Sequence, residues 1–348
     1  MTIAPYRGRR AATIENANLR LTVLEEGGHI AEIFDKASGV NPLWTPPWPT
    51  IEPSHFGRAD AGAYGRGSDA RLLAGIMGHN LCLDIFGPPS DEEEIAGLTA
   101  HGEGSVVRYE LTVLGERLTA RARLPIAGLD FERMIVLGER AVHVRETVTN
   151  QSGGERPIGW TQHVTLGPPF LEPGTTMFRV SATRSKVFES TFGADDYLKP
   201  GAEFEWPMAP ALTGGAADLR VFADAKQSSA YTAHLMDPAS PIAYFTAFSP
   251  TFRLAFGYAW RRADFPWMGI WEENHSRVHP PWNGRTMTRA MEFGVSPMPE
   301  TREAMVRRGS LFGVPTFRRI ASGSSIAVEY YVLLQPAEVI PDSLAWPG

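Results

Sequence analysis

Hydrophobic and polar residues alternate along short segments through most of the chain, and glycine or proline interrupts the alternation at close intervals. A period of two places alternate side chains on opposite faces of a β-strand. The clearest segments are 109–113, 118–122, 131–136 and 142–148 in the first half, and 243–248, 254–260 and 327–334 in the second. The pattern predicts many short strands in a large antiparallel sandwich or barrel.

Helical periodicity is scarce. The acidic stretch 91–94 and the segment 300–308 are the better candidates for single short helices or turns. Residues 41–75 are rich in proline, glycine and tryptophan, and we expect them to form a long loop at one end of the sandwich, where loops often carry function. No fixed repeat or composition break marks a boundary, so a single domain over residues 1–348 is predicted.

Composition narrows the class of protein. Of 348 residues, 43% are hydrophobic and 21% are charged, which is typical of a globular protein. The net charge of -6 argues against a nucleic-acid partner, and no apolar run is long enough to span a membrane. The first ten residues lack the apolar core of a secretory signal, so we expect a cytoplasmic protein. Cys82 is the only cysteine, which excludes an intramolecular disulfide and a cysteine metal cluster.

Two segments about a hundred residues apart carry candidate acid–base groups. In the first, His163 follows Trp160 and Gln162 on a strand-like stretch that ends at a glycine and two prolines. In the second, Trp271 precedes Glu272. A proton donor and a proton acceptor beside flat apolar surface suit acid–base chemistry on a sugar. A hydrogen-bonded core histidine is an equally good interpretation of His163 from these residues alone.

Glu273 follows Glu272 directly, and adjacent residues on a strand point to opposite faces, so only one of the two can face a given cavity. His101 precedes Gly102, and a glycine there permits a close backbone approach that would leave the imidazole at the edge of a strand. A histidine in a surface loop is the simpler alternative.

Other catalytic motifs find no support. His275 and His279 have the spacing of a helical zinc site, but the following Pro280-Pro281 pair argues against a helix and no third ligand is in register, so we expect no metal. Phosphate-binding glycine loops and the nucleophilic serine elbow are both missing from the sequence.

Several segments together resemble the aldose 1-epimerase (galactose mutarotase-like) family over nearly the whole chain. Residues 19–44 are similar to its first hairpin, and residues 322–331 to its last turn and strand. His101-Gly102 resembles its His-Gly motif, His163 the histidine of its His-x-Tyr-Phe-Asn segment, and Glu272 with Asn274 its Glu-x-Gln strand. The chain departs from the family where Ser105 replaces an arginine and Val164-Thr165-Leu166 follows His163, which indicates a divergent branch.

This resemblance implies an all-β fold, a large antiparallel β-supersandwich with few short helices. It also implies a mutarotase that exchanges the α and β anomers of a hexose or related monosaccharide without a cofactor. Glu272 would take the proton of the anomeric hydroxyl, His163 would protonate the ring oxygen, and His101 would hold a sugar oxygen. The expected substrate-binding residues are Trp160, Gln162, Trp271, Arg71 and Arg277, the arginines as readers of an anionic substituent.

Two alternatives stay open. A carbohydrate-binding protein could keep the cleft of this fold without turnover, because a fold does not guarantee its chemistry. A glycan lyase or hydrolase would need carboxylates that face each other across a bond, for which the adjacent Glu272 and Glu273 are poorly suited. We expect a monomer or a homodimer with no nucleic-acid or membrane partner.

Overall fold

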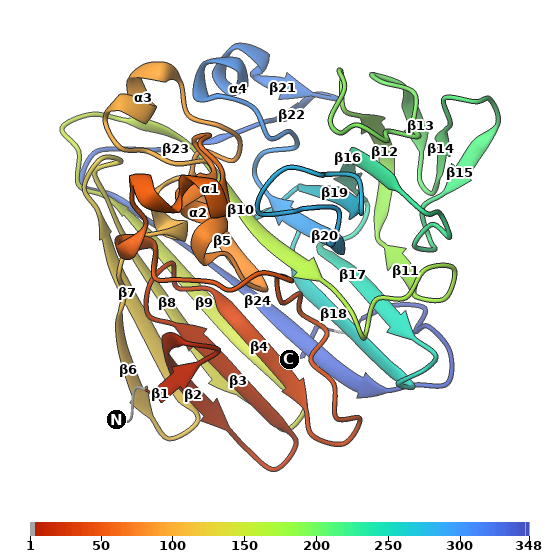
Figure 1. Cartoon of the computed structure of the whole chain (residues 1–348), viewed down its shortest axis with the longest axis horizontal. Helices are drawn as coiled ribbons and strands as arrows, with labels where there is room; N and C mark the ends of the chain where they lie inside the picture. Colours follow the sequence, from red (N-terminus) through yellow and green to blue (C-terminus); the bar gives the residue numbers. More distant parts are fainter. Residues whose placement is uncertain (1–3, 345, 348) are drawn as a thin grey trace.

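The computed structural model describes residues 4–344, 346 and 347, and two large antiparallel sheets dominate it (Figure 1). The larger, twelve-stranded sheet runs in the order β1 (Ala4–Tyr6), β2 (Arg9–Glu15), β3 (Leu19–Leu24), β4 (Ile30–Asp35), β5 (His79–Asp84), β10 (Arg156–Leu166), β20 (Met287–Gly294), β19 (Trp267–Asn274), β16 (Ser228–Met236), β12 (Ala182–Val187) and β13 (Glu203–Glu205), and β23 (Arg318–Ile320) pairs with β10.

The second sheet has eight strands, in the order β11 (Met177–Val180), β17 (Ile242–Ser249), β18 (Leu254–Arg261), β24 (Ser325–Pro336), β9 (Ala141–Asn150), β8 (Leu129–Leu137), β7 (Arg117–Leu124) and β6 (Glu110–Leu114). Two small pairs complete the strands: β14 (Met208–Pro210) with β15 (Ala216–Asp218), and β21 (Ser310–Leu311) with β22 (Val314–Pro315). The all-β, antiparallel sandwich predicted from alternation is confirmed, including every strand segment named from the sequence.

The two sheets bury their residues differently. Along β8 the side chains alternate between buried and half-buried, because one face packs on the core and the other meets solvent. Along β16 and β19 every residue is buried. We call the face of the twelve-stranded sheet that packs against the eight-stranded sheet its inner face, and the opposite face its outer face. Trp160 and Ile270 belong to the inner face and pack with Trp260 and Tyr330 of the other sheet, whereas Trp271 and Ala290 belong to the outer face.

The long segment 41–75 covers part of the outer face. It contains the 3₁₀ turns η1 (Pro53–His55) and η2 (Arg58–Asp60) and the short helices α1 (Ala61–Tyr64) and α2 (Ala70–Gly75), shown in orange in Figure 1. Trp44, Trp48 and Leu72 from this segment pack with Tyr231 and Trp271. The predicted loop is therefore a cover that buries the second face of the central strands.

Two further helices begin and end close to where the sequence indicates them. α3 (Asp91–Ile95) starts at Ser90, whose hydroxyl accepts a hydrogen bond from the Glu93 amide. α4 (Arg302–Arg308) starts at Thr301, which caps it in the same way. A third 3₁₀ turn, η3 (Glu103–Ser105), follows His101.

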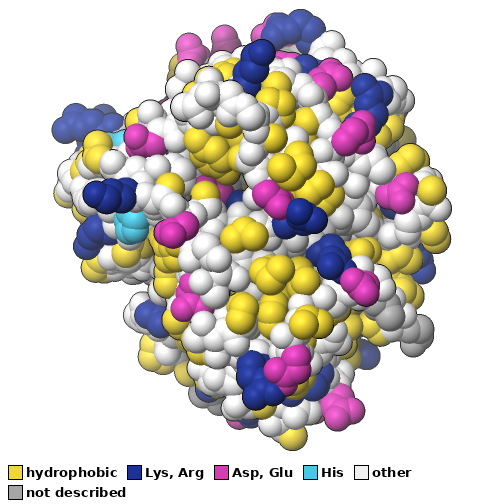
Figure 2. All heavy atoms as spheres, turned by 90° about the vertical axis from the view of Figure 1, so that its right-hand side faces the viewer, with side chains coloured by type: hydrophobic (Ala, Val, Ile, Leu, Met, Phe, Trp, Pro, Cys, Tyr) yellow, Lys and Arg dark blue, Asp and Glu magenta, His cyan; other side chains and the backbone are white. Residues whose placement is uncertain are grey.

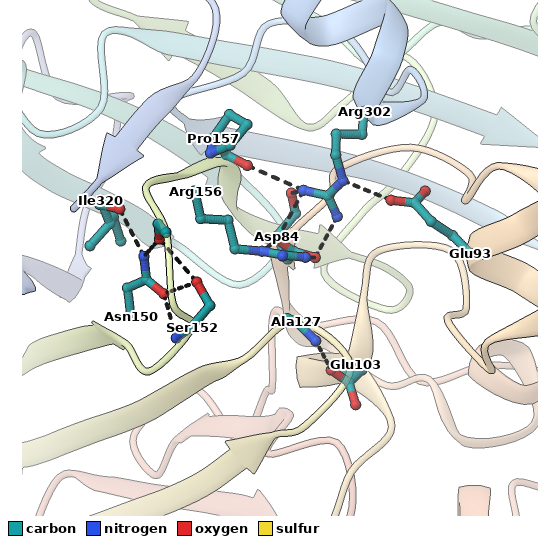
Figure 3. Close-up of polar contacts among 11 residues, drawn as sticks. Asp84, Glu93, Glu103, Ala127, Asn150, Ser152, Arg156, Pro157, Arg302 and Ile320 are labelled. Atoms are coloured by element: carbon teal, nitrogen blue, oxygen red, sulfur yellow. Dashed lines mark hydrogen bonds and ion pairs between the residues drawn. The ribbon is translucent and has the colours of Figure 1, made fainter. Parts of the chain in front are cut away.

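A buried carboxylate connects these helices to the sheet. Asp84, at the end of β5, accepts two hydrogen bonds from Arg156 (2.6 and 2.8 Å) and is contacted by Arg302 of α4 at 2.5 Å (Figure 3). Arg302 also donates to Glu93 of α3 at 2.7 Å. Bidentate arginine–carboxylate pairs hold a fixed geometry, so both helices are anchored next to the segment that carries His101.

Within the described residues, none of the helices has the length and apolar character needed to cross a bilayer. Figure 2 shows the face that carries β13, β14 and β15, where hydrophobic side chains are interspersed with arginine, lysine and carboxylate groups. Met208 and Leu212 are among the exposed hydrophobic residues of this lobe.

Candidate active site

A small cavity of about 100 Å³ lies on the outer face, beneath the cover formed by segment 41–75. Its charged and imidazole groups are Asp69, His101, His163, Arg277 and Glu292. The remaining lining is aromatic or apolar: Leu72, Leu73, Ile76, Phe86, Phe192, Tyr231, Trp271, Trp282 and Pro299. A mostly apolar pocket with a few convergent polar groups is the usual form of a small-molecule site.

Strand register brings the two central groups together. His163 of β10 stands directly opposite Glu292 of β20, and Glu292 stands opposite Gly269 of β19. Directly opposed residues share a face, so all three meet on the outer face. At Gly269 a Cβ atom would lie 2.3 Å from the Tyr231 hydroxyl oxygen and 3.0 Å from Glu292 Oε2. Only glycine leaves room here for both polar groups.

His163 is held at both ring nitrogens. Its Nε2 lies 2.9 Å from Glu292 Oε1, and its Nδ1 lies 2.9 Å from the Thr165 hydroxyl. Nε2 donates to the carboxylate, and Nδ1 accepts from the Thr165 hydroxyl in the neutral ring or donates to it when the ring carries both protons. The other carboxylate oxygen, Glu292 Oε2, is buried and has no hydrogen-bond partner among the described residues. Glu292 therefore lines the cavity and keeps one carboxylate oxygen that no described residue bonds within hydrogen-bond geometry.

His101 packs edge-on against His163, with ring centres 5.2 Å apart. Its Nδ1 donates to the Phe86 carbonyl oxygen at 2.6 Å, which leaves Nε2 as an acceptor in the neutral ring. Burial, reinforced by neighbouring His163, lowers the pKa of His101 to about 3, so it is neutral at physiological pH. The following Gly102 approaches β5 so closely that a Cβ atom would lie 2.1 Å from the Leu83 carbonyl oxygen. The close approach inferred from the His-Gly pair is confirmed.

Aromatic rings and one arginine form the far side of the cavity. The guanidinium of Arg277 lies over the rings of Phe192, Trp271 and Trp282, at 5.8, 5.3 and 5.0 Å from their centres. Burial lowers the pKa of Arg277, and nearby Glu273 opposes that shift. The indole Nε1 atoms of Trp271 and Trp282 are buried and have no hydrogen-bond acceptor among the described residues. Two donors and one acceptor near the cavity are thus unpaired, which a polar ligand could satisfy.

Solved structures with the same architecture are related to this chain at low sequence identity. A candidate aldose 1-epimerase from Klebsiella pneumoniae superposes with a TM-score of 0.65 at 14% identity, over 95% of this chain and 80% of the other. Galactose mutarotase-like proteins from Clostridium acetobutylicum and Lactobacillus casei superpose with TM-scores of 0.60 and 0.57, both at 13% identity. They cover 96% and 93% of this chain and 97% and 100% of their own. No protein-family model and no curated protein matches the sequence.

The chain has the galactose mutarotase-like fold. The fold expected from the resemblance is thereby confirmed, with sequence identities low enough to agree with a divergent branch. Likeness at this level concerns the fold alone, and the chemistry has to be argued from the site.

In this mutarotase-like sandwich, four of the residues named from the sequence line the cavity: His101, His163, Trp271 and Arg277. Trp160 and Gln162 do not, because they alternate with His163 along β10 and point to the inner face. There Trp160 Nε1 and Gln162 Nε2 donate to Glu146 at 3.1 and 2.6 Å. Both side chains belong to a polar cluster between the sheets, and the expectation that they contact substrate is not met by this geometry.

Glu272 also faces inward. Its Oε2 pairs with Arg289 at 2.7 Å and its Oε1 accepts from the Ser228 hydroxyl at 2.8 Å. The expectation that Glu272 and His163 share a cavity is not met, because the two side chains point to opposite faces of one sheet. Glu273 faces outward, as alternation requires, but its Oε1 accepts from the Ser276 and Arg277 amides at 2.8 Å and it does not line the cavity.

Arg71 lies on α2, next to the lining residue Leu72, and its Nε donates to the Pro53 carbonyl oxygen at 3.2 Å. It therefore secures the cover and is not among the lining residues. Arg277 is the arginine of the cavity.

Sequence reasoning missed Glu292. It stands in Met291-Glu292-Phe293-Gly294, a single carboxylate within a hydrophobic strand. A charged residue in such a run needs a partner, because an isolated buried charge is costly. That signal was available in the sequence, although the identity of the partner was not. Among the described residues, no cluster of histidine, cysteine and carboxylate groups has the makings of a metal site.

Proposed function

We propose that this protein is a cofactor-independent aldose 1-epimerase acting on a monosaccharide, and that His163 and Glu292 are its acid–base pair. The observation that supports this most strongly is the 2.9 Å contact between His163 Nε2 and Glu292 Oε1 at the cavity wall, with Glu292 Oε2 left free. Anomer exchange needs one group that accepts a proton and one that donates a proton, and nothing else.

The reaction would begin when Glu292 Oε2 takes the proton of the anomeric hydroxyl. The bond between C1 and the ring oxygen breaks, and the ring oxygen takes the Nε2 proton of His163, which acts as an imidazolium and is left as a neutral imidazole. Rotation of the aldehyde about the C1–C2 bond exposes its other side. Closure returns the proton of the ring-derived hydroxyl to His163 and the Glu292 proton to the new anomeric oxygen. The roles differ from those implied by the family resemblance only in the carboxylate, which is Glu292 in place of Glu272.

Four other residues would position the sugar. Neutral His101 offers Nε2 as an acceptor for a sugar hydroxyl, and the indole N–H groups of Trp271 and Trp282 offer donors. Arg277 would donate to a sugar oxygen or an anionic substituent. These roles account for the unpaired polar atoms around the cavity.

A second candidate is a sugar-binding protein of the same fold without turnover. The observation that favours it is the position of Arg277, whose guanidinium covers the faces of Trp271 and Trp282 and narrows the cavity. A sugar would have to shift this arginine before it could stack on either ring.

NMR on a panel of aldoses and uronic acids tests both candidates in one sample. Exchange spectroscopy measures the rate of anomer interconversion, and saturation transfer measures binding. The proposal expects accelerated exchange for at least one sugar. Binding with exchange at the spontaneous rate would decide for the second candidate. Neither binding nor acceleration for any sugar in the panel would reject both.

A further inference from the structure

A second cleft lies away from the cavity, where the β18–β19 turn, the end of β20 and β23 meet the β21–β22 hairpin. It has a volume of about 570 Å³ and is lined by Arg262, Ala263, Pro266, Val295, Gly309, Val314, Pro315, Phe317, Arg318 and Arg319. None of these residues lines the cavity that holds His163. Three of its ten lining residues are arginines, and none is a carboxylate.

Two of these arginines have no carboxylate partner within the described residues. Arg319 pairs with Glu155 at 2.9 Å, so its charge is balanced. Arg318 donates only to main-chain carbonyl oxygens, those of Ala263 at 3.0 Å and Asp264 at 2.8 Å. Arg262 Nε is buried and has no hydrogen-bond acceptor among the described residues. The cleft therefore carries two guanidinium groups without an ion pair among the described residues, although the Asp264 carboxylate stabilises the charge of Arg318 from farther away.

The fully buried arginines of this protein behave differently. Arg9, Arg133 and Arg289 each contact a glutamate, at 2.8, 2.7 and 2.7 Å. A guanidinium removed from water is stabilised by an anion, and these three obtain one from the chain. Arg262 and Arg318 are half-buried, and burial lowers the pKa of Arg318. A bound anion would supply the negative charge that no ion pair of the chain provides.

The strand beneath the cleft is firmly held. β23 pairs with the start of β10, with Arg318 opposite Ile158 and Ile320 opposite Arg156. Figure 3 shows Asn150 donating to the Ile320 carbonyl oxygen, a contact of 2.9 Å. Arg318 therefore projects from an anchored backbone, which favours a preformed site over a flexible surface side chain.

We propose that this cleft binds a small phosphate monoester with an apolar body. Two guanidinium groups without an ion pair match the charge of a phosphate monoester, which is about -1.5 to -2 at pH 7. Planar guanidinium groups bind phosphate oxygens through parallel hydrogen bonds. Pro266, Pro315 and Phe317 form apolar walls that would contact the organic part of the ligand. The proposal is independent of the function assigned to the cavity.

Calorimetric titration of the whole protein tests this site with phenyl phosphate, inorganic phosphate and phenol as probes. We expect phenyl phosphate to bind more tightly than inorganic phosphate, and phenol not to bind. Arg262→Gln should weaken phenyl phosphate binding about tenfold or more, since it removes a charged hydrogen-bond donor. Binding should also weaken below pH 6, where the phosphate loses its second charge.

Arg145→Gln is the matched control, because Arg145 is exposed on β9, has no ion pair among the described contacts, and gives the same change in net charge. Arg318→Gln is less decisive alone, since it also removes the hydrogen bonds to residues 263 and 264 and could perturb folding. The proposal is overturned if phenyl phosphate gives no heat at millimolar concentration, or if Arg262→Gln and Arg145→Gln weaken binding equally. Displacement of phenyl phosphate by a neutral monosaccharide would place the ligand in the other cavity and also reject it.

Discussion

The two faces of the twelve-stranded sheet hold buried carboxylates in opposite ways. On the inner side, Glu146 accepts four hydrogen bonds, from Arg133, Trp160, Gln162 and Tyr330, and both oxygens of Glu272 are bonded to neighbours. On the outer face, Glu292 bonds to His163 through one oxygen and leaves the other unpaired beside a cavity.

The difference separates structural from reactive polar groups. A buried carboxylate whose lone pairs are all used by the protein has nothing left to offer a ligand, and it fixes the packing of the sheets. A buried carboxylate with a free oxygen beside a cavity keeps a capacity for hydrogen bonding or proton transfer. Residue type is the same in both cases, so it does not distinguish the two roles.

The largest expected effect comes from exchanging the two glutamates in this comparison. Glu292→Gln should lower the rate of anomer exchange by roughly 10²–10⁴-fold, because the amide is not a base. Glu272→Gln should leave the exchange rate close to that of the wild type when measured on folded protein. NMR exchange rates on both variants check this. Loss of activity in Glu272→Gln with retention in Glu292→Gln would reverse the assignment.

For the free energy of unfolding, the order of the two glutamates should be reversed, with the larger loss at Glu272. Glu272→Ala removes the only ion-pair partner that the described part of the chain gives the fully buried Arg289, and should lower the free energy of unfolding by about 3–5 kcal/mol. Urea denaturation followed by tryptophan fluorescence measures it. Glu292→Ala serves for comparison and should cost less, since it leaves behind an imidazole that still bonds to Thr165 and not a guanidinium, which always keeps its charge. Equal losses in the two variants would show that the faces do not differ in this respect.

A buried histidine of the inner side should make the stability of the protein sensitive to acid, whereas an exposed histidine should not. His79, on the inner side, donates from Nε2 to Gln162 and accepts at Nδ1 from Tyr258, and burial lowers its pKa well below the usual 6.5. The unfolded chain therefore takes up a proton near pH 6.5 that folded His79 does not. Its contribution to stability is complete above pH 6.5 and declines as the pH falls below it.

We expect His79→Gln to reduce the slope of unfolding free energy against pH below 6 by about 1.4 kcal/mol per pH unit, the value for one proton. Urea unfolding at a series of pH values measures the slope, and the exposed His279→Gln is the control. An unchanged slope in His79→Gln would contradict the assignment of a neutral buried imidazole.

The smallest effect concerns the unpaired indole donors of the outer side. Trp271→Phe keeps an aromatic wall and removes one N–H group, so it should weaken sugar binding by about 1 kcal/mol, the value of a typical hydrogen bond. Trp160→Phe is the inner-face counterpart, and should leave sugar affinity unchanged while lowering stability, since its N–H is bonded to Glu146. Saturation-transfer titrations measure affinity. A larger loss of affinity in Trp160→Phe would show that a change on the inner face alters sugar binding on the outer face.

Much of the fold could be predicted from the sequence because the sheets alternate polar and apolar residues where one face is solvated. β7, β8 and β9 follow that pattern, and their positions were identified directly. β16 lies between β19 and β12 and is buried on both faces, so it has no alternation and was not identified.

The candidate site was predicted only in part, because the strands that form it lack alternation. His101, His163 and Trp271 were named and line the cavity, whereas Glu292 was overlooked and Glu272 was chosen. β19 and β20 are buried on both sides, so neither hydrophobicity nor neighbouring residues indicates which face a glutamate occupies. The pairing of β10 with β20 decides it, and that pairing joins residues more than a hundred positions apart.

By itself, the sequence determined that the chain forms an antiparallel β sandwich with few short helices, because a period of two and frequent turn residues admit little else. It also determined that Glu272 and Glu273 face opposite ways. Only the tertiary structure decided which face holds the cavity, which carboxylate meets His163, and where two arginines lie without a partner. Those facts depend on strand register and on loops that fold over the sheet, and both are set by long-range packing.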